Sequence, residues 1–238
     1  MGVAVAATWL GPGERGRFEM YLVDGEATLV TCTVDLPDAR QLVRGAIDAA
    51  RRCDASSLQI TTSPDYRGTG PAIDELRTQG ADVLDTDDIL AVDLAASVPH
   101  SHDSLGVEVV EVSTYEQVAE FERTSARGWG YPDPSADVIQ AAYSRLTPGW
   151  FLAYSCGEPA GTAGFALVGA VARLWGGAVV PAVRGRGVYR SLVSCRLSTA
   201  TARGAALALV HAAPSSSPIL QRLGFRKFGE HHVFRLAL

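Results

Sequence analysis

The first 95 residues alternate between segments with strand-like spacing and helix-like spacing of hydrophobic positions. Residues 18–34 contain two apolar, β-branched runs on either side of Asp24-Gly25, a dipeptide that favours a hairpin turn. Residues 37–53 then change to helical spacing, with a proline at the start. The remaining predicted elements of this half are a strand at 57–62, a short helix at 71–79 that Gly80 ends, and a strand at 88–94.

The second half shows the same alternation of predicted strands and helices, which indicates an α/β fold around a sheet with some parallel pairing. A small, polar, turn-prone stretch at 95–105 separates the halves. We therefore expect an N-terminal domain at 1–100, a linker at 101–105 and a second domain at 106–238. Its predicted elements are a strand at 107–112, helices at 114–127 and 135–146, strands at 150–155, 159–169 and 171–180, a helix at 188–203, a strand at 206–211, a helix at 217–223 and a strand at 230–236.

The two halves also share an apolar register. A shift of 150 positions places the helical face Leu42, Val43, Ile47 and Ala50 onto Leu192, Val193, Leu197 and Ala200. Few of the aligned residues are identical, but the order of the predicted elements is the same in both halves. The sequence therefore favours a degenerate duplication.

Composition narrows the classes of function. Hydrophobic residues make up 47% of the chain and charged residues 20%, which predicts a full core and argues against disorder. The net charge of −5 excludes a general nucleic-acid binder that relies on bulk attraction, because neutralising phosphates requires a basic face. A local basic pocket remains compatible with this charge.

The four cysteines are spread along the chain without a C-x-x-C motif, so we expect reduced thiols and no metal site: Cys32, Cys53, Cys156 and Cys195. The apolar run Val3 to Leu10 lacks a basic flank and is too short for a signal peptide, and no stretch reaches membrane-spanning length. We expect a cytoplasmic protein with neither nucleic acid nor membrane as partner. A homodimer is left open.

A glycine-rich turn between a strand and a helix is the most informative motif. After a β-branched strand and a proline come Arg184-Gly185-Arg186-Gly187, and a helix begins at once. Glycines let successive backbone N–H groups converge on one point, and the helix N-terminus adds the positive end of its dipole. Arg184, Arg186 and Arg190 add positive charge, so a diphosphate-bearing ligand fits the turn. A tight turn with surface arginines explains the same residues without a ligand.

This turn and a second motif resemble the GNAT superfamily of N-acetyltransferases. The acyl-coenzyme A signature of that family, R/Q-x-x-G-x-G/A, reads Arg184, Gly187 and Tyr189 here, with a tyrosine where glycine or alanine is usual. The segment Ile219 to Phe225 is similar to a second landmark, a short helix that ends in Leu-Gly-Phe. The resemblance covers residues 106–238 and implies a GNAT-like mixed central sheet flanked by helices. With the duplication it implies a tandem GNAT whose first half is truncated or degenerate.

The resemblance also implies a reaction and a co-substrate. It implies an N-acyltransferase that moves an acyl group from acetyl-CoA, or a related acyl-CoA, to a small-molecule or peptide amine by direct attack on the thioester. The acyl-CoA would lie between the fourth and fifth strands, with a strand N–H that polarises the thioester carbonyl. The implied binding residues are Ala178, Val179 and Val180 for the pantetheine arm, and the amides of Arg184, Gly185, Arg186, Gly187, Val188 and Tyr189 for the pyrophosphate.

The residues that would move protons are less evident. The tyrosine that family members use to protonate the leaving thiolate corresponds to Leu220, and residues 159–183 contain no Asp or Glu. His211, Tyr189 and Ser217 are the candidates for catalysis. Each also has a structural explanation: a strand-end histidine, a tyrosine that packs on the core and a serine that caps a helix. Three aromatic residues are candidates to line the acceptor pocket, with ordinary core packing as their alternative: Trp129, Tyr131 and Trp150.

A non-catalytic acyl-CoA-binding or regulatory module is the alternative to an enzyme, because it would keep the cradle without the proton-handling groups. A purely structural protein would require the glycine turn to be empty. The first half offers Val34 to Ala39 at the position of the turn, where both glycines are missing, Pro37 lacks an N–H, and two aspartates would repel a diphosphate. We therefore expect at most one cradle in the chain.

Overall fold

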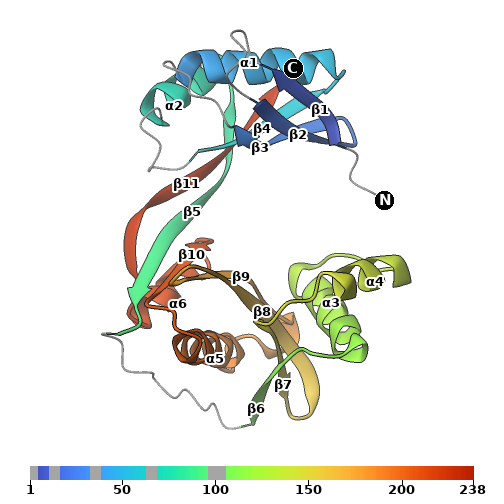
Figure 1. Ribbon diagram of the computed structural model, residues 1–238, viewed down its shortest axis with the longest axis vertical. Helices are drawn as coiled ribbons and strands as arrows, with labels where there is room; N and C mark the ends of the chain where they lie inside the picture. The colour runs from blue at the N-terminus through green and yellow to red at the C-terminus, as the bar shows by residue number, and fades with distance from the viewer. Residues whose placement is uncertain (1–4, 11–16, 33–38, 63–68, 96–105) are drawn as a thin grey trace. The chain divides into compact units, whose positions relative to one another are not determined.

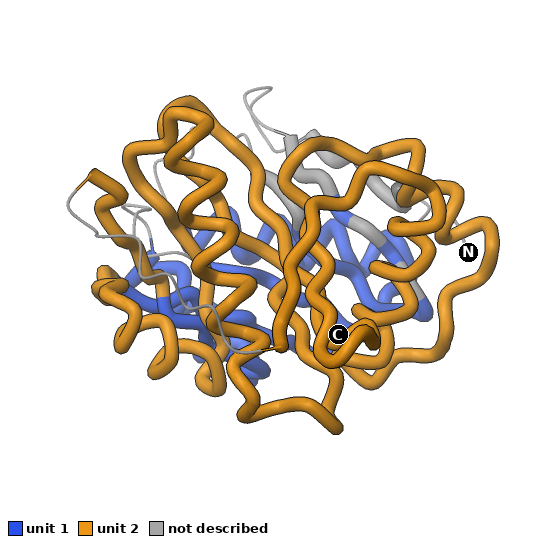
Figure 2. Tube along the Cα trace, turned by 90° about the horizontal axis from the view of Figure 1, so that it is seen from below, with its two compact units in different colours: residues 1–88, 229–238 blue, residues 89–228 orange. Residues whose placement is uncertain are grey.

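The computed structural model describes residues 5–10, 17–32, 39–62, 69–95 and 106–238. The chain divides into two units, one of residues 1–88 with 229–238 and one of residues 89–228 (Figure 2). These limits differ from the domains expected at 1–100 and 106–238, because the second unit begins at Ile89 and the last ten residues belong to the first unit. The predicted linker at 101–105 lies outside the described residues.

The first unit contains a sheet in the order β1-β2-β3-β4-β11, with two helices (Figure 1). Asp24 and Gly25, with φ of 50° and 80°, connect β2 to β3 and confirm the predicted hairpin, since such turns require positive φ at both central residues. The apolar run near the N-terminus, which carried no strand prediction, forms β1. The elements of the first unit are β1 (Val5–Leu10), β2 (Arg17–Val23), β3 (Glu26–Cys32), α1 (Ala39–Arg52), β4 (Ser57–Thr62), α2 (Thr69–Thr78), the first part of β5 (Asp82–Asp93) and most of β11 (Arg226–Ala237).

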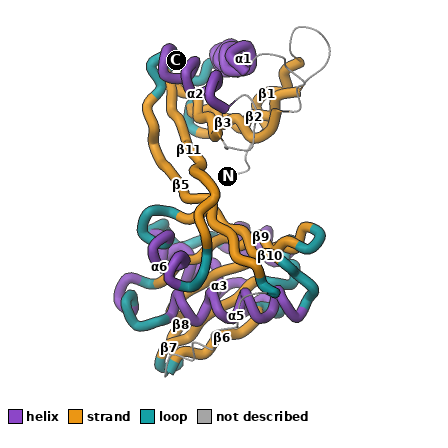
Figure 3. The backbone as a smooth tube through the Cα atoms, turned by 90° about the vertical axis from the view of Figure 1, so that its left-hand side faces the viewer, coloured by secondary structure: helices purple, strands orange, loops and turns teal. Residues whose placement is uncertain are grey.

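The core of the first unit lies between α1 and the sheet. The predicted apolar face of α1 is buried at Val43, Ile47 and Ala50. Strand β11 runs antiparallel to β4, with Phe234 opposite Ile60, and contributes two buried side chains to the same core. Strand β11 therefore completes a unit whose other elements lie in the first 88 residues. Figure 3 shows β5 and β11, which both contain a boundary between the units.

The second unit contains a mixed sheet in the order β5-β10-β9-β8-β7-β6. Strands β6 to β9 pair antiparallel in succession, whereas β10 runs parallel to β9, and this confirms the expected mixed sheet. Its elements are β6 (Val107–Glu111), α3 (Tyr115–Trp129), α4 (Ala136–Ser144), β7 (Trp150–Ser155), β8 (Glu158–Val168), β9 (Val171–Val179), a 3₁₀ turn (Pro181–Val183), α5 (Val188–Ala202), β10 (Leu207–Ala212) and α6 (Ser217–Arg222).

Helices cover both faces of this sheet, as Figure 1 shows for α3 and α5. Alternate residues of β7 point to opposite faces: Phe151 and Ala153 belong to the core beneath α5, and Leu152 to the core beneath α3. Trp150 packs beside Trp175, with ring centroids 5.2 Å apart, so core packing accounts for it. Among the described residues, no helix is long and apolar enough to cross a membrane.

Candidate functional site

The sheet of the second unit opens between its two parallel strands. The pairing of β10 with β9 runs from Val171 to Leu174, and the rest of β9 pairs with β8 alone among the described strands. A register shift places an extra β9 residue at this point, where Gly176 has φ of +64°. A bulge bends the strand that carries it. Beyond Leu174, β9 therefore presents an edge that no described strand covers.

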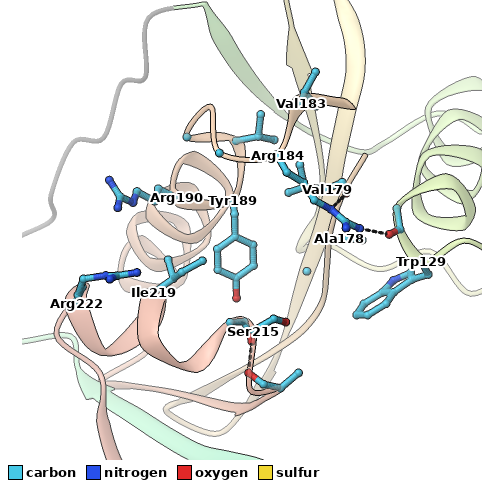
Figure 4. A pocket seen from close by; sticks show the side chains of 17 residues that line it. Trp129, Ala178, Val179, Val183, Arg184, Tyr189, Arg190, Ser215, Ile219 and Arg222 are labelled. Carbon is cyan, nitrogen blue, oxygen red and sulfur yellow. Dashed lines mark hydrogen bonds between the residues drawn. The ribbon is translucent and has the colours of Figure 1, made fainter. Parts of the chain in front are cut away.

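A cavity of about 480 Å³ lies at this edge (Figure 4). Its wall combines the end of β9, the glycine turn, the first turn of α5, the segment before α6, two residues of α6 and the end of α3. The lining residues are Gly128, Trp129, Gly177, Ala178, Val179, Val183, Arg184, Gly185, Gly187, Val188, Tyr189, Arg190, Ala213, Ser215, Ser216, Ile219 and Arg222. All of them belong to the second unit.

Backbone donors at the turn have no acceptor among the residues that the structure describes. Gly185 and Gly187 have φ of +77° and +88°, a region that residues with a Cβ rarely adopt. The N–H of Ser191 donates to the Gly187 carbonyl (3.0 Å), and none of the N–H groups from Gly185 to Arg190 bonds to an acceptor in the described part of the chain. The last three of them belong to the first turn of α5, which cannot satisfy its own donors. The turn thus holds the free donors and the positive helix end that an anion requires.

Arg184 joins two walls of the cavity. Its Nε donates to the Val179 carbonyl (3.1 Å), and its Nη2 donates to the Gly128 carbonyl at the end of α3 (2.8 Å). Figure 4 shows this side chain lying across the strand toward α3. Its guanidinium therefore holds β9, the turn and α3 together, in addition to its positive charge. Arg190 and Arg222 also line the cavity and are exposed, whereas Arg186 is exposed but is not a lining residue.

Tyr189 lies inside the cavity and covers the bulge of β9. A Cβ added to Gly177 would lie 2.9 Å from Cε2 of Tyr189, so the ring packs directly on that glycine. Figure 4 shows the tyrosine in the middle of the cavity, with its hydroxyl directed toward Ser215. The residue that replaces the usual glycine or alanine of the signature therefore fills part of the space between α5 and β9.

Arg196 is a buried arginine beneath Tyr189, and the sequence interpretation did not single it out. It is 2% exposed, and it donates to the carbonyls of Leu192 (3.2 Å), Gly164 (3.3 Å) and Trp175 (3.4 Å). It also hydrogen-bonds Tyr189, and burial lowers the pKa of its guanidinium. Its position four residues after Leu192, on the apolar face of α5, was the available signal in the sequence.

The other predicted residues lie outside the cavity lining. The N–H of Val180 donates to the Ala160 carbonyl (2.9 Å), so that amide already has an acceptor. His211 is exposed near the end of β10. Ser217 is buried, and its Oγ accepts a hydrogen bond from Gln221 (2.9 Å). The catalytic roles of His211 and Ser217 stay predictions.

Three further expectations concern Trp129, Leu220 and the first half of the chain. Trp129 is 52% exposed and lines the cavity, so core packing does not account for it. Leu220, at the position of the family's tyrosine, is fully buried. Residues 34–38, where the sequence predicts that the first half has no cradle, lie outside the described part of the chain, so this stays a prediction. No cluster of three or more His, Cys, Asp or Glu residues suited to a metal ion occurs among the described residues.

Comparison with known proteins agrees with the resemblance. Residues 115–225 match the model of the acetyltransferase (GNAT) family. No curated protein is similar enough in sequence to count as a match.

Solved structures share the fold at low sequence identity. A GCN5-related N-acetyltransferase from Sphaerobacter thermophilus superposes with a TM-score of 0.75 at 12% identity, over 93% of this chain and 76% of that one. One from Kribbella flavida gives 0.66 at 16% identity, over 97% and 89%. A tandem GNAT protein from the clavulanic acid biosynthesis pathway gives 0.69 at 16% identity, over 99% and 85%. Residues 115–225 therefore form a domain of the GNAT acetyltransferase family, and the chain has the fold of GNAT proteins, a tandem GNAT among them.

Proposed function

We propose that the protein is an acyl-CoA-dependent N-acyltransferase that transfers an acetyl or related acyl group to an amine. In this proposal the amides of Gly185 to Arg190 bind the pyrophosphate of coenzyme A, and the open edge of β9 at Ala178 and Val179 binds the pantetheine arm. The free N–H groups beside a cavity are the observation that carries the proposal. Membership of the GNAT family supports acyl transfer in general, and the amine acceptor belongs to the proposal alone.

The chemistry assigned to the chain is mainly binding and polarisation. Acyl-CoA supplies an activated acyl group as a thioester. A backbone N–H at the open end of β9 would donate to the thioester carbonyl and stabilise negative charge there, a contribution typically worth about 3 kcal/mol per donor. A bound amine beside Trp129 would gain a further advantage from proximity. The Arg184 side chain keeps β9 and the turn in register for both tasks.

A matched pair of glycine substitutions tests the cradle. Gly185 and Gly204 both have positive φ, 77° and 87°, and a Cβ at either position meets no atom within 4 Å. Alanine at either position should therefore cost a similar strain, about 1–2 kcal/mol of unfolding free energy. We expect Gly185→Ala to weaken acetyl-CoA binding in calorimetric titration, while Gly204→Ala binds like the parent. Equal affinities for both variants would refute the placement.

Turnover is tested separately by measuring CoA release from acetyl-CoA against a panel of amines. An amine that raises the rate above the buffer background is the expected result. Tight binding of acetyl-CoA without any such amine would overturn the assignment as an enzyme.

A non-catalytic acyl-CoA-binding module is the second candidate. It is favoured by the chemistry of the cavity wall, because no Asp, Glu, His, Cys or Lys occurs among the described residues that line it. It predicts binding with the same sensitivity to Gly185→Ala and no amine-dependent release of CoA, so the two experiments together distinguish the candidates.

A further inference from the structure

The path that the proposed function gives to acyl-CoA leads toward Gly177. Strand β9 runs from its bulge to the glycine turn, and Ala178 and Val179 lie between the two. With the pyrophosphate on the turn and the pantetheine arm along these two residues, the acyl end points back along the strand. The next residue that it reaches is Gly177, which also lines the cavity.

The ring of Tyr189 occupies this end of the path. Its Cε2 lies 2.9 Å from the position that a Cβ on Gly177 would take, so the ring packs directly on the backbone of β9. That position therefore faces α5. The Cβ of Ala178, in contrast, faces Gly128 of α3. Figure 4 shows the ring in the middle of the cavity, with its hydroxyl directed toward Ser215. An acyl chain that extends past Gly177 on the side of α5 would meet this ring.

Two contacts hold the ring in place. Tyr189 hydrogen-bonds Arg196, and its ring packs against the apolar core of the second unit. Arg196 is itself fixed, since it is 2% exposed and donates to the carbonyls of Gly164 (3.3 Å) and Trp175 (3.4 Å), the last pair before the bulge. Moving the ring aside would break its hydrogen bond to a buried guanidinium, and such a loss is costly. The ring therefore forms a fixed wall of the cavity.

We propose that Tyr189 limits the length of the acyl group, and that the cavity takes acetyl-CoA in preference to acyl-CoA with a longer chain. The inference rests on the proposed function and names the acyl class of its co-substrate. An acetyl group ends at its methyl group beside the ring, whereas further methylenes have to displace the ring. Tyr189 determines specificity through the space that it fills, and this role requires no proton transfer.

The affinities of a series of acyl-CoA ligands test this wall. Calorimetric titration of the full-length protein with CoA, acetyl-CoA, butyryl-CoA and hexanoyl-CoA measures them without an acceptor amine. For the parent we expect butyryl-CoA to bind about tenfold more weakly than acetyl-CoA, because overpacking against a held ring is unfavourable. Hexanoyl-CoA should bind more weakly still. Equal affinities for the three acyl-CoA ligands would overturn the inference.

Removing the ring should reverse the order of affinities. Tyr189→Ala opens the end of the path, so butyryl-CoA should bind about tenfold more tightly than acetyl-CoA, since each methylene that leaves water gains about fourfold in affinity. The ratio of the two affinities is the readout, because a general loss of structure would weaken both ligands alike. An unchanged preference for acetyl-CoA in this variant would refute the role of the ring.

A second substitution separates the ring from its hydroxyl. Tyr189→Phe keeps the aromatic ring on Gly177 and should keep the preference for acetyl-CoA. A preference lost as completely as in Tyr189→Ala would assign it to the hydroxyl and would overturn the inference. Tyr143→Ala, which removes a tyrosine from an exposed position of α4, is the matched control and should keep the ratio of the parent.

Gly177→Ala changes the same wall in the opposite direction. The new Cβ would push the ring of Tyr189 into the path of the acyl group. Affinity for acetyl-CoA should therefore fall about tenfold relative to affinity for CoA, which has no acyl group. Equal losses for the two ligands would contradict the position of the acyl end and overturn the inference. This variant decides the test where thermal unfolding shows that Tyr189→Ala does not fold.

The outcomes distinguish this inference from the proposed function. Acyl-CoA ligands that bind alike at every length, together with amine-dependent release of CoA, overturn the role of Tyr189 and leave the acyltransferase intact. A preference for acetyl-CoA that Tyr189→Ala reverses, without any amine that raises the release of CoA, supports the role of Tyr189 and overturns the enzyme. Failure of CoA and of every acyl-CoA to bind overturns both.

Discussion

Arg184 combines two roles at the cavity: it carries positive charge, and it joins β9 to α3 by hydrogen bonds. The sequence identified this arginine as positive charge for a phosphate, whereas the structure adds two hydrogen bonds to carbonyls of β9 and α3. The sequence pattern identifies this residue because a glycine-rich turn follows it, but the pattern does not reveal which distant carbonyls the guanidinium reaches. Arg196 was missed for a related reason, since an arginine on a helix is ordinarily read as a surface residue.

Replacing Arg184 should therefore affect folding as well as binding. We expect Arg184→Ala to lower the free energy of unfolding by about 1–2 kcal/mol, because two hydrogen bonds are lost, and to weaken acetyl-CoA binding. Arg186→Ala removes the same charge from an exposed residue outside the cavity lining and should leave stability unchanged. Urea unfolding of both variants measures the difference. Identical stabilities would show that the contacts of Arg184 contribute nothing.

Tyr154 predicts a pH dependence of stability. Burial and the hydrogen bond that its hydroxyl donates to Glu120 raise the pKa of Tyr154 to about 12, from an ordinary value of 10.0. The folded protein therefore binds this proton more tightly than the unfolded chain does. The resulting stabilisation is complete below pH 10 and is lost as the pH rises through 12. Tyr154→Phe should flatten this loss in urea unfolding measured from pH 9 to 12, and an unchanged slope would contradict the assignment.

At the scale of elements, local sequence patterns predict most helices and strands. The features that form the cavity are irregularities of the sheet that these patterns do not predict. The hairpin, the strand β7 and the helix α5 were predicted because spacing and turn residues act locally. The bulge at Gly176 and the early end of the β9–β10 pairing were not, because they depend on partners far away in the sequence. Strand β5 begins at Asp82, whereas the predicted strand began at residue 88. The prediction missed the first part of the strand because its polar residues do not alternate clearly with apolar ones.

The close approach of α3 to β9 gives a prediction at this scale. A Cβ on Gly128 would lie 2.8 Å from the Cβ of Ala178, and both residues line the cavity. We expect Gly128→Ala to force the helix and the strand apart, at a cost of about 1–3 kcal/mol in unfolding free energy, and to weaken acetyl-CoA binding. Gly70→Ala, at a helical position with open space around it, should be neutral or slightly stabilising. Thermal unfolding and calorimetry check both variants, and a neutral Gly128→Ala would contradict the packing.

At the scale of the whole molecule, the two units are not two successive segments of the chain. The sequence indicated two domains in succession, but residues 229–238 belong to the first unit. Hydrophobic periodicity reports the period of an element and not its partner, so the pairing of β11 with β4 could not be read from the pattern of the last strand. The family resemblance, by contrast, was readable from two short motifs and is confirmed for residues 115–225.

Two phenylalanines of β11 test the membership of the last strand. Phe234 is 1% exposed in the core of the first unit, and Phe228 on the same strand is 65% exposed. Phe234→Ala should lower the free energy of unfolding by about 3–5 kcal/mol, whereas Phe228→Ala should change it little. Hydrogen exchange of β4 should rise in the first variant, because its paired strand is loosened. Unchanged exchange in β4 would contradict the pairing.

The free donors at the glycine turn are the central claim, and amide chemical shifts of the isotopically labelled full-length protein test it most directly. On titration with acetyl-CoA, the N–H resonances from Gly185 to Arg190 should shift together and saturate with one ligand per chain, while those of Gly204 and its neighbours stay in place. Saturable binding that leaves the resonances of 185–190 unmoved would contradict the account.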